Sequence, residues 1–174
     1  MKGLLHIYCG DGKGKTTAAA GLAVRAAGRG MKVVIARFLK TEDSGEVGVL
    51  RAIPGIQVLP CTKTFGFTFQ MTPEEKKEAA AYYQEQFRLA CREAISQEAD
   101  LLILDEILAA CNTGMVPENE VTAFLTARPE KLEVVLTGRD PSETLTGLAD
   151  YVSEIQARKH PFTRGQKARK GIEF

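Results

Sequence analysis

A glycine-rich segment near the start of the chain places the strongest constraint on its fold. Residues 10–17 read Gly-Asp-Gly-Lys-Gly-Lys-Thr-Thr and follow an apolar run at residues 4–9. A helical pattern then covers residues 15–27 and is ended by Gly28 and Gly30. This order of strand, glycine-rich loop and helix is typical of parallel α/β proteins, in which loop N–H groups and the positive end of the helix dipole face an anion.

Apolar strand patterns and amphipathic helix patterns alternate along the rest of the chain. Strands are predicted at residues 33–38, 56–59, 101–104, 133–136 and 151–155. Helices are predicted at residues 72–97, at residues 118–127 and after residue 140. The sequence Thr72-Pro73-Glu74-Glu75 is a well-formed helix start, Asp140 is interpreted as a helix cap, and the Gly-, Ser- and acid-rich residues 41–48 are interpreted as a loop. The alternation predicts an α/β fold with a mostly parallel central sheet and helices on both faces.

Length and composition predict one globular domain over residues 1–174. The chain has 44% hydrophobic and 26% charged residues, and its length is close to that of an average domain. Its four cysteines form no CxxC pair, which favours reduced thiols and a cytoplasmic location. No apolar run reaches the ~18 residues of a membrane span, residues 2–9 are too short for a signal peptide, and the pI near 7.6 argues against a nucleic-acid partner.

The net charge of +1 conceals an uneven distribution along the chain. Residues 1–40 hold eight basic and one acidic side chain, and residues 157–174 hold six and one. The two ends therefore carry +7 and +5, and residues 41–156 carry −11. This pattern predicts an anion-binding site to which both ends of the chain contribute.

The lysines and threonines of the glycine-rich loop suit a nucleotide polyphosphate. Lys15 would place a point charge at the terminal phosphates, Lys13 would add a second cation, and Thr16 would supply a hydroxyl ligand to Mg²⁺. The usual pattern has four residues between its first glycine and Gly-Lys-Thr, whereas Gly10 and Gly14 enclose three. The motif therefore supports triphosphate binding more firmly than γ-phosphoryl transfer. The alternative is a plain glycine-rich turn with two solvated lysines. It offers no packing reason for three glycines, two lysines and two threonines to occur at these positions.

Two further polar segments follow predicted strands. Asp105 and Glu106 come directly after the strand at residues 101–104, where a carboxylate can ligate or orient Mg²⁺; for one of the two, a helix-capping role is the alternative. Arg139 follows the strand at residues 133–136 and is a candidate phosphate or ribose contact, with a surface ion pair as an equal alternative.

From residue 4 to the last residue, the chain resembles the P-loop class of ATP:corrinoid adenosyltransferases, which have a RecA-like fold. The segments that carry the resemblance are the loop at residues 10–17, Lys-Thr-Phe-Gly-Phe-Thr-Phe at 63–69, Leu-Asp-Glu at 104–106, Leu-Thr-Gly-Arg at 136–139, Leu-Ala-Asp at 148–150 and the tail at 159–174. The resemblance implies a reaction in adenosylcobalamin biosynthesis or salvage, in which Co(I) of a reduced corrinoid attacks the 5′ carbon of ATP and displaces triphosphate. It also implies Mg²⁺, a homodimer and an electron donor such as a reduced flavoprotein.

The same resemblance implies roles for individual residues. The ATP-binding residues would be Gly10, Asp11, Gly12, Lys13, Gly14, Lys15, Thr16, Thr17 and Arg139. The catalytic residues would be Lys15, Lys13 and Glu106, the metal ligands Thr16, Glu106 and Asp105, and the corrinoid contacts Phe67 and Phe69. Phe69 stands where tryptophan is expected, and Asp11 stands where asparagine is more familiar. Asp11 therefore adds a negative charge near phosphate unless it turns outward or caps a backbone group.

Two alternatives remain open from the residues alone. A P-loop nucleotide kinase or ATPase would use the same loop and would produce ADP. A non-enzymatic, ATP-dependent corrinoid-binding module would bind ATP and form no adenosyl product.

Overall fold

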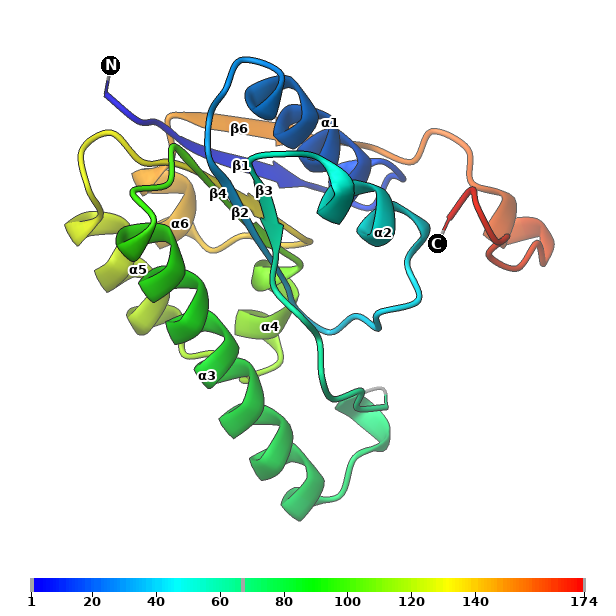
Figure 1. Ribbon diagram of the computed structural model, residues 1–174. Helices are drawn as coiled ribbons and strands as arrows, with labels where there is room; N and C mark the ends of the chain where they lie inside the picture. The colour runs from blue at the N-terminus through cyan, green and yellow to red at the C-terminus, as the bar shows by residue number, and fades with distance from the viewer. Residues whose placement is uncertain (1, 67, 174) are drawn as a thin grey trace.

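The computed structural model describes residues 2–66 and 68–173 and has a parallel sheet at its centre (Figure 1). The strands are β1 Leu5–Cys9, β2 Val33–Arg37, β3 Ile56–Val58, β4 Leu101–Asp105, β5 Glu133–Thr137 and β6 Tyr151–Glu154. Their order across the sheet is β3-β2-β4-β5-β1-β6, and every neighbouring pair is parallel. The predicted α/β class is confirmed.

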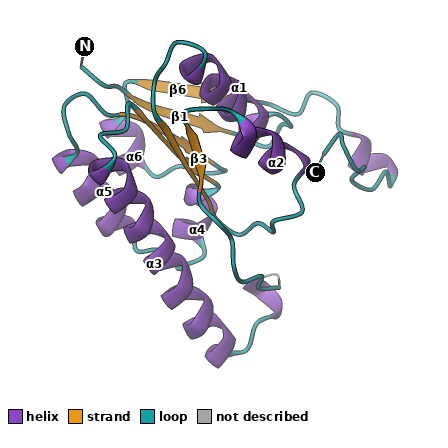
Figure 2. Cartoon of the chain, in the orientation of Figure 1, coloured by secondary structure: helices purple, strands orange, loops and turns teal. Residues whose placement is uncertain are grey.

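Helices cover both faces of this sheet, as Figure 2 shows. They are α1 Lys15–Ala27, α2 Gly45–Ala52, α3 Pro73–Ser96, α4 Ile107–Asn112, α5 Glu118–Ala127 and α6 Glu143–Leu148, with 3₁₀ turns η1 Thr68–Gln70 and η2 Pro161–Arg164. Helices α1 and α2 pack on one face, against Val33 and Ile35 of β2. Helices α3 to α6 pack on the other, against Val34 and Ala36 of the same strand. Successive strand residues thus serve opposite cores, which explains the continuous apolar strand sequences.

Helix α3 begins as its sequence predicts. Thr72 accepts a hydrogen bond from the Glu75 backbone N–H at 3.2 Å, and the Glu75 carboxylate accepts one from the Thr72 backbone N–H at 2.8 Å. These two bonds form a capping box, and Pro73 occupies the first turn. The N-terminal turns of α3 and the turn η1 extend past the edge of the sheet at which the strands end (Figure 1).

Two local expectations are wrong, and one helix was not expected. Residues 41–48 are not wholly a loop, because α2 starts at Gly45 and is held by the buried Val47 and Leu50. Asp140 is not a helix cap: it has a left-handed backbone (φ 48°), and the Ser142 hydroxyl caps α6 by accepting from the Leu145 N–H at 3.1 Å. The short helix α4 is a further element that periodicity did not indicate.

The parallel arrangement brings the carboxyl ends of the strands to one edge. Cys9, Arg37, Asp105 and Thr137 end four neighbouring strands there. The glycine-rich loop and Glu106 follow directly. Ligands of open α/β sheets bind at this edge, so the fold places the predicted polar residues together. Among the described residues, no helix is both long and apolar enough to cross a membrane.

Candidate active site

The glycine-rich loop is fixed against the segment that follows β6. Gly10 has φ 104°, and a Cβ atom there would lie 2.4 Å from the Ile155 carbonyl oxygen. The N–H of Gly12 donates to the same oxygen at 2.7 Å. Only glycine combines this backbone conformation with so close an approach. The first half of the loop is therefore packed in place, and the second half leads into α1.

Lys15 lies inside the loop that it belongs to. Its side chain is buried, and its ammonium donates to the Gly12 carbonyl oxygen at 2.9 Å. Burial lowers the pKa of Lys15, and the nearby Glu106 carboxylate opposes that shift. A buried ammonium that donates to a carbonyl oxygen of its own loop is placed to exchange that contact for a phosphate oxygen.

Asp105 is the centre of a buried polar cluster beside the loop. Its Oδ1 accepts hydrogen bonds from the Thr16 hydroxyl at 2.9 Å and from the Thr137 hydroxyl at 2.7 Å. Its Oδ2 accepts from the Lys40 ammonium at 2.5 Å, and Lys40 also donates to Thr16 Oγ1 at 2.7 Å. The predicted metal ligands Thr16 and Asp105 are thus in direct contact.

Glu106 takes a different position from Asp105. It has a left-handed backbone (φ 63°), and its side chain makes no capping hydrogen bond to α4, so the capping alternative fails for this residue. The pKa of the Glu106 carboxyl is raised, mainly by burial and to a smaller extent by the negative charge of Asp105. A positive charge bound here would relieve both effects.

A cavity of about 220 Å³ unites most of the predicted ATP-binding residues. Its lining residues are Asp11, Gly12, Lys13, Gly14, Lys15, Thr16, Thr17, Glu106, Arg139, His160, Ile172 and Glu173. Gly10, the first residue of the loop, is not among the lining residues. A larger adjoining cavity of about 700 Å³ shares Thr16 and Thr17 with it. The two ends of the chain therefore meet at one site.

Asp11 and Arg139 have distinct surroundings in this cavity. Asp11 Oδ1 accepts from the Ala157 backbone N–H at 2.9 Å, and this bond is the main reason why the pKa of Asp11 is lowered. Asp11 thus caps a backbone group, one of the two arrangements the sequence allowed. Arg139 lines the cavity, and no ion pair engages it among the described residues.

The family model described as "ATP:corrinoid adenosyltransferase BtuR/CobO/CobP" matches residues 1–174. The chain belongs to this family. Its activity is therefore the ATP-dependent adenosylation of a corrinoid in cobalamin biosynthesis.

Curated relatives match the chain over nearly all of its length. A corrinoid adenosyltransferase of Escherichia coli K12 is 36% identical over 174 residues, which are 99% of this chain and 86% of the relative. A corrinoid adenosyltransferase of Pseudomonas aeruginosa is 34% identical over 99% of this chain and 84% of its own. Among solved structures, EssC (ATPases 2 and 3) of Geobacillus thermodenitrificans matches with a TM-score of 0.50 and 13% identity, over 98% of this chain and 36% of that chain. This likeness supports a P-loop NTPase-like fold.

The aromatic segment at residues 63–69 is only partly described. Phe67 lies outside the described residues, and of Phe69 only the backbone, in η1, is described. Their role as corrinoid contacts in this adenosyltransferase stays a prediction. Phe65 packs against Tyr82 and Tyr83 of α3, with ring centroids 5.6 and 5.7 Å apart, so it anchors the segment.

Lys40 is a site residue that sequence reasoning missed. It follows β2 by three positions, and its partners Thr16 and Asp105 are 24 and 65 positions away. The signal was a basic residue just beyond the carboxyl end of a buried strand, which is the place where Asp105 was recognised.

Proposed function

We propose that the cavity at the glycine-rich loop holds the triphosphate of ATP while Co(I) of a reduced corrinoid attacks the ribose 5′ carbon. The Co–C bond forms as the C5′–O bond breaks, and triphosphate leaves with the electron pair. Cobalt is the nucleophile, so the protein needs no nucleophilic side chain. Its tasks are to align the 5′ carbon with cobalt and to stabilise the charge that develops on the leaving group.

Lys13, Lys15 and the loop N–H groups support the second task. Lys13, Lys15 and Arg139 line the same small cavity, and Lys15 is already desolvated. Charges held in a buried site interact more strongly with a phosphate than charges in water do, and they need no rearrangement as the bond breaks. The single observation that carries the proposal is this convergence of three cations with the loop around a cavity.

Thr16, Asp105 and Glu106 would hold Mg²⁺, which supplies positive charge to the triphosphate when bound. Hydroxyl and carboxylate oxygens are the ligands that Mg²⁺ prefers. The described residues contain no group of three or more His, Cys, Asp or Glu side chains that could hold a metal. Mg²⁺ normally completes its shell with water and substrate phosphates, so this sparse donor set fits a metal that arrives with the nucleotide.

An anaerobic assay with reduced corrinoid, ATP and Mg²⁺ tests the proposal. We expect the absorbance change of a new Co–C bond, dependent on all three components. Formation of ADP and phosphate would support the kinase or ATPase alternative. ATP binding without any adenosyl product would support the binding-module alternative.

We further propose that residues 1–174 act as a single domain that forms a homodimer. All described strands join one sheet. Strand β6 forms an edge of this sheet, and its Tyr151 and Val152 are about half exposed, which suits a contact with a second copy. Sedimentation equilibrium should give twice the chain mass, and disruption by Val152→Lys would locate the contact.

A reducing, cytoplasmic location and a reduced flavoprotein as electron donor complete the proposal. The thiols of Cys9, Cys61, Cys91 and Cys111 are free, and burial raises the pKa of Cys91 and of Cys111 to about 12. Thiols with so high a pKa are rarely ionised and therefore resist oxidation. Free thiols without disulfides are usual in proteins of a reducing compartment. Cell fractionation tests the location. Reconstitution with a reduced flavoprotein and Co(II) corrinoid tests the donor.

A further inference from the structure

The Lys40 ammonium is bonded to two of the oxygen atoms that would bind a metal. Its ammonium bonds to Asp105 Oδ2 and to Thr16 Oγ1, and the side chains of Lys40 and Asp105 are 21% and 3% exposed. The Thr16 hydroxyl has one proton, which it donates to Asp105 Oδ1. Its oxygen offers two lone pairs, and Lys40 uses one of them.

A divalent cation on Thr16 and the Lys40 ammonium exclude each other electrostatically. A metal on the second lone pair of Thr16 would lie within a few ångströms of the ammonium, in a site with little water to screen the repulsion. The carboxylates of Asp105 and Glu106 supply at most two negative charges, fewer than the three positive charges of Mg²⁺ and the ammonium together. Mg²⁺ must therefore displace Lys40 from Thr16.

Lys40 can leave without a change of the backbone. The preceding segment is held by the Phe38 N–H, which donates to the Asp105 carbonyl oxygen at 2.9 Å. The following segment is held by Arg37, whose guanidinium donates to the Thr41 carbonyl oxygen at 2.8 Å. Between these fixed points, the Lys40 side chain borders the cavity of about 700 Å³. That cavity adjoins Thr16 and Thr17, so the displaced ammonium remains close to the loop.

We propose that Lys40 is a triphosphate-binding residue that makes metal binding depend on the triphosphate. Its ammonium competes with Mg²⁺ for Thr16 and Asp105, and it transfers its hydrogen bonds to triphosphate oxygens when the metal and the triphosphate enter together. Mg²⁺ alone then binds poorly, because it must break the hydrogen bonds of the ammonium to Asp105 and Thr16 without supplying the phosphate oxygens that would replace them. This inference rests on the triphosphate and Mg²⁺ site of the proposed function, and it adds a third lysine to the leaving group.

Thermal unfolding with Mg²⁺ alone, and with Mg²⁺ plus inorganic triphosphate, tests this inference without any corrinoid. Wild-type protein should show no shift with Mg²⁺ alone and a clear rise of the melting temperature with both. Lys40→Met should gain a rise of about 3 °C with millimolar Mg²⁺ alone. Calorimetry should show that Lys40→Met binds Mg²⁺–triphosphate about tenfold more weakly, because a charge-assisted contact is lost.

Two further variants keep the test decisive if Lys40→Met fails to fold. Lys40→Gln retains a hydrogen-bond donor but no charge, and it should respond to Mg²⁺ alone. Lys40→Arg retains the charge, and it should not. Lys32→Met is the matched control, because Lys32 lies at the opposite end of β2, is exposed, and donates its ammonium hydrogen bond to the Gln97 carbonyl oxygen.

The outcomes separate the inference from the proposed function. Equal responses of wild type, Lys40→Gln and Lys40→Met to Mg²⁺ alone, with unchanged triphosphate affinity, would overturn the role of Lys40 alone. A wild-type protein that Mg²⁺ and triphosphate together fail to stabilise would overturn the proposed site itself, and the inference with it.

Discussion

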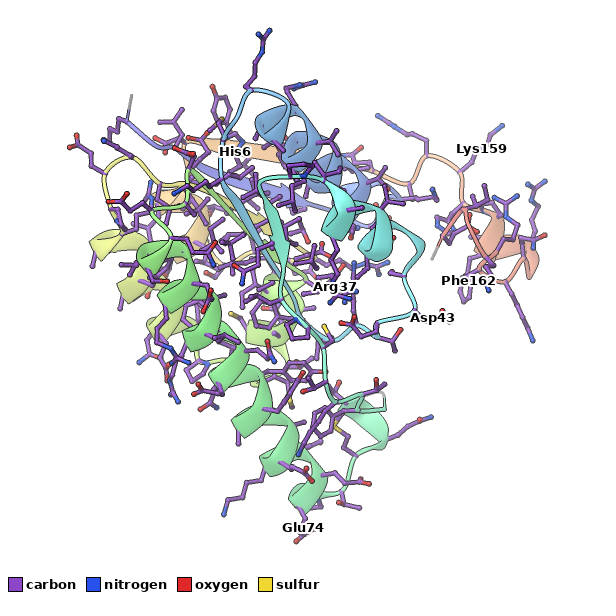
Figure 3. The ribbon with its side chains drawn as sticks, in the orientation of Figure 1. His6, Arg37, Asp43, Glu74, Lys159 and Phe162 are labelled. Atoms are coloured by element: carbon purple, nitrogen blue, oxygen red, sulfur yellow. The ribbon has the colours of Figure 1, made fainter. Side chains whose placement is uncertain are left out.

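The glycine-rich loop and the C-terminal tail line the same cavity but differ in how they are held. The loop is packed between β1, β6 and α1, and Lys15 in the loop and Asp105 beside it are both buried. Residues 161–173 are exposed throughout, and Phe162 is 75% exposed; in Figure 3, Lys159 and Phe162 project from the rest of the domain. The comparison indicates that the leaving-group site is preorganised by the core, whereas its cover depends on a segment with few stabilising contacts.

The largest effect is expected where the rigid half of the site touches the leaving group. Lys15→Ala should lower turnover by about a hundredfold or more, because one preorganised charge on the developing triphosphate is lost. Initial rates of Co–C bond formation provide the measurement, and circular dichroism checks the fold. Lys32→Ala, at the other end of the sheet, is the control and should keep its rate. A normal rate for Lys15→Ala would refute the assigned role.

The next largest effect is a loss of stability on replacing a glycine, and it should differ between a glycine of the loop and a glycine of the tail. Gly10 and Gly171 both have positive φ, but a Cβ on Gly10 meets the Ile155 carbonyl oxygen at 2.4 Å, whereas a Cβ on Gly171 meets nothing within 4 Å. Gly10→Ala should therefore lower the free energy of unfolding by about 3 kcal/mol, and Gly171→Ala by about 1 kcal/mol or less. Urea denaturation measures both. Equal losses would show that the loop is no more tightly packed than the tail.

A smaller effect concerns the bond that joins the two regions. Asp11→Ala removes the acceptor for the Ala157 N–H, so residues 157–173 should be cleaved several-fold faster by a protease at low concentration. Asp11→Asn keeps an acceptor oxygen without the charge and should be cleaved more slowly than Asp11→Ala, at a rate closer to that of wild type. If both variants are cleaved equally fast, the charge of Asp11 rather than its hydrogen bond holds the tail.

The smallest effect is expected for the ion pair within the tail. Hydrogen bonds from Arg169 lower the pKa of Glu173 to about 2, from an ordinary value of 4.5. Any stability from this depressed pKa is present above about pH 4.5 and is lost as the pH falls toward 2. Because the pair lies in the exposed tail, Glu173→Gln should change the melting temperature at pH 7 by less than about 1 °C. A drop of several degrees would mean that the tail is packed as firmly as the loop.

The sequence predicted the segment around the glycine-rich loop well and the segment after β2 poorly. Strand β1, the loop and α1 were predicted to within a residue because periodicity, glycines and motif agree. Helix α2 was missed because Ser44, Gly45 and Gly48 favour a loop locally, whereas the burial of Val47 and Leu50 favours a helix in the folded chain.

The site was predicted as far as local motifs reach. Asp105 and Glu106 were found because a carboxylate after a buried strand is a recognisable pattern. The contacts of Lys40 and the hydrogen bond from the Ala157 N–H to Asp11 join residues up to 146 positions apart, which no local pattern encodes. The cap at Ser142 was assigned to Asp140 because both residue types cap helices well, and the left-handed backbone of Asp140 becomes evident only in the folded chain.

The fate of the three phosphates tests the central claim most directly. Phosphorus NMR of the products from wild-type enzyme, ATP, Mg²⁺ and reduced corrinoid should show intact triphosphate, in a one-to-one ratio to the adenosylated corrinoid measured by absorbance. ADP with inorganic phosphate, or triphosphate well below the amount of adenosylated corrinoid, would contradict a site built to hold triphosphate as the leaving group.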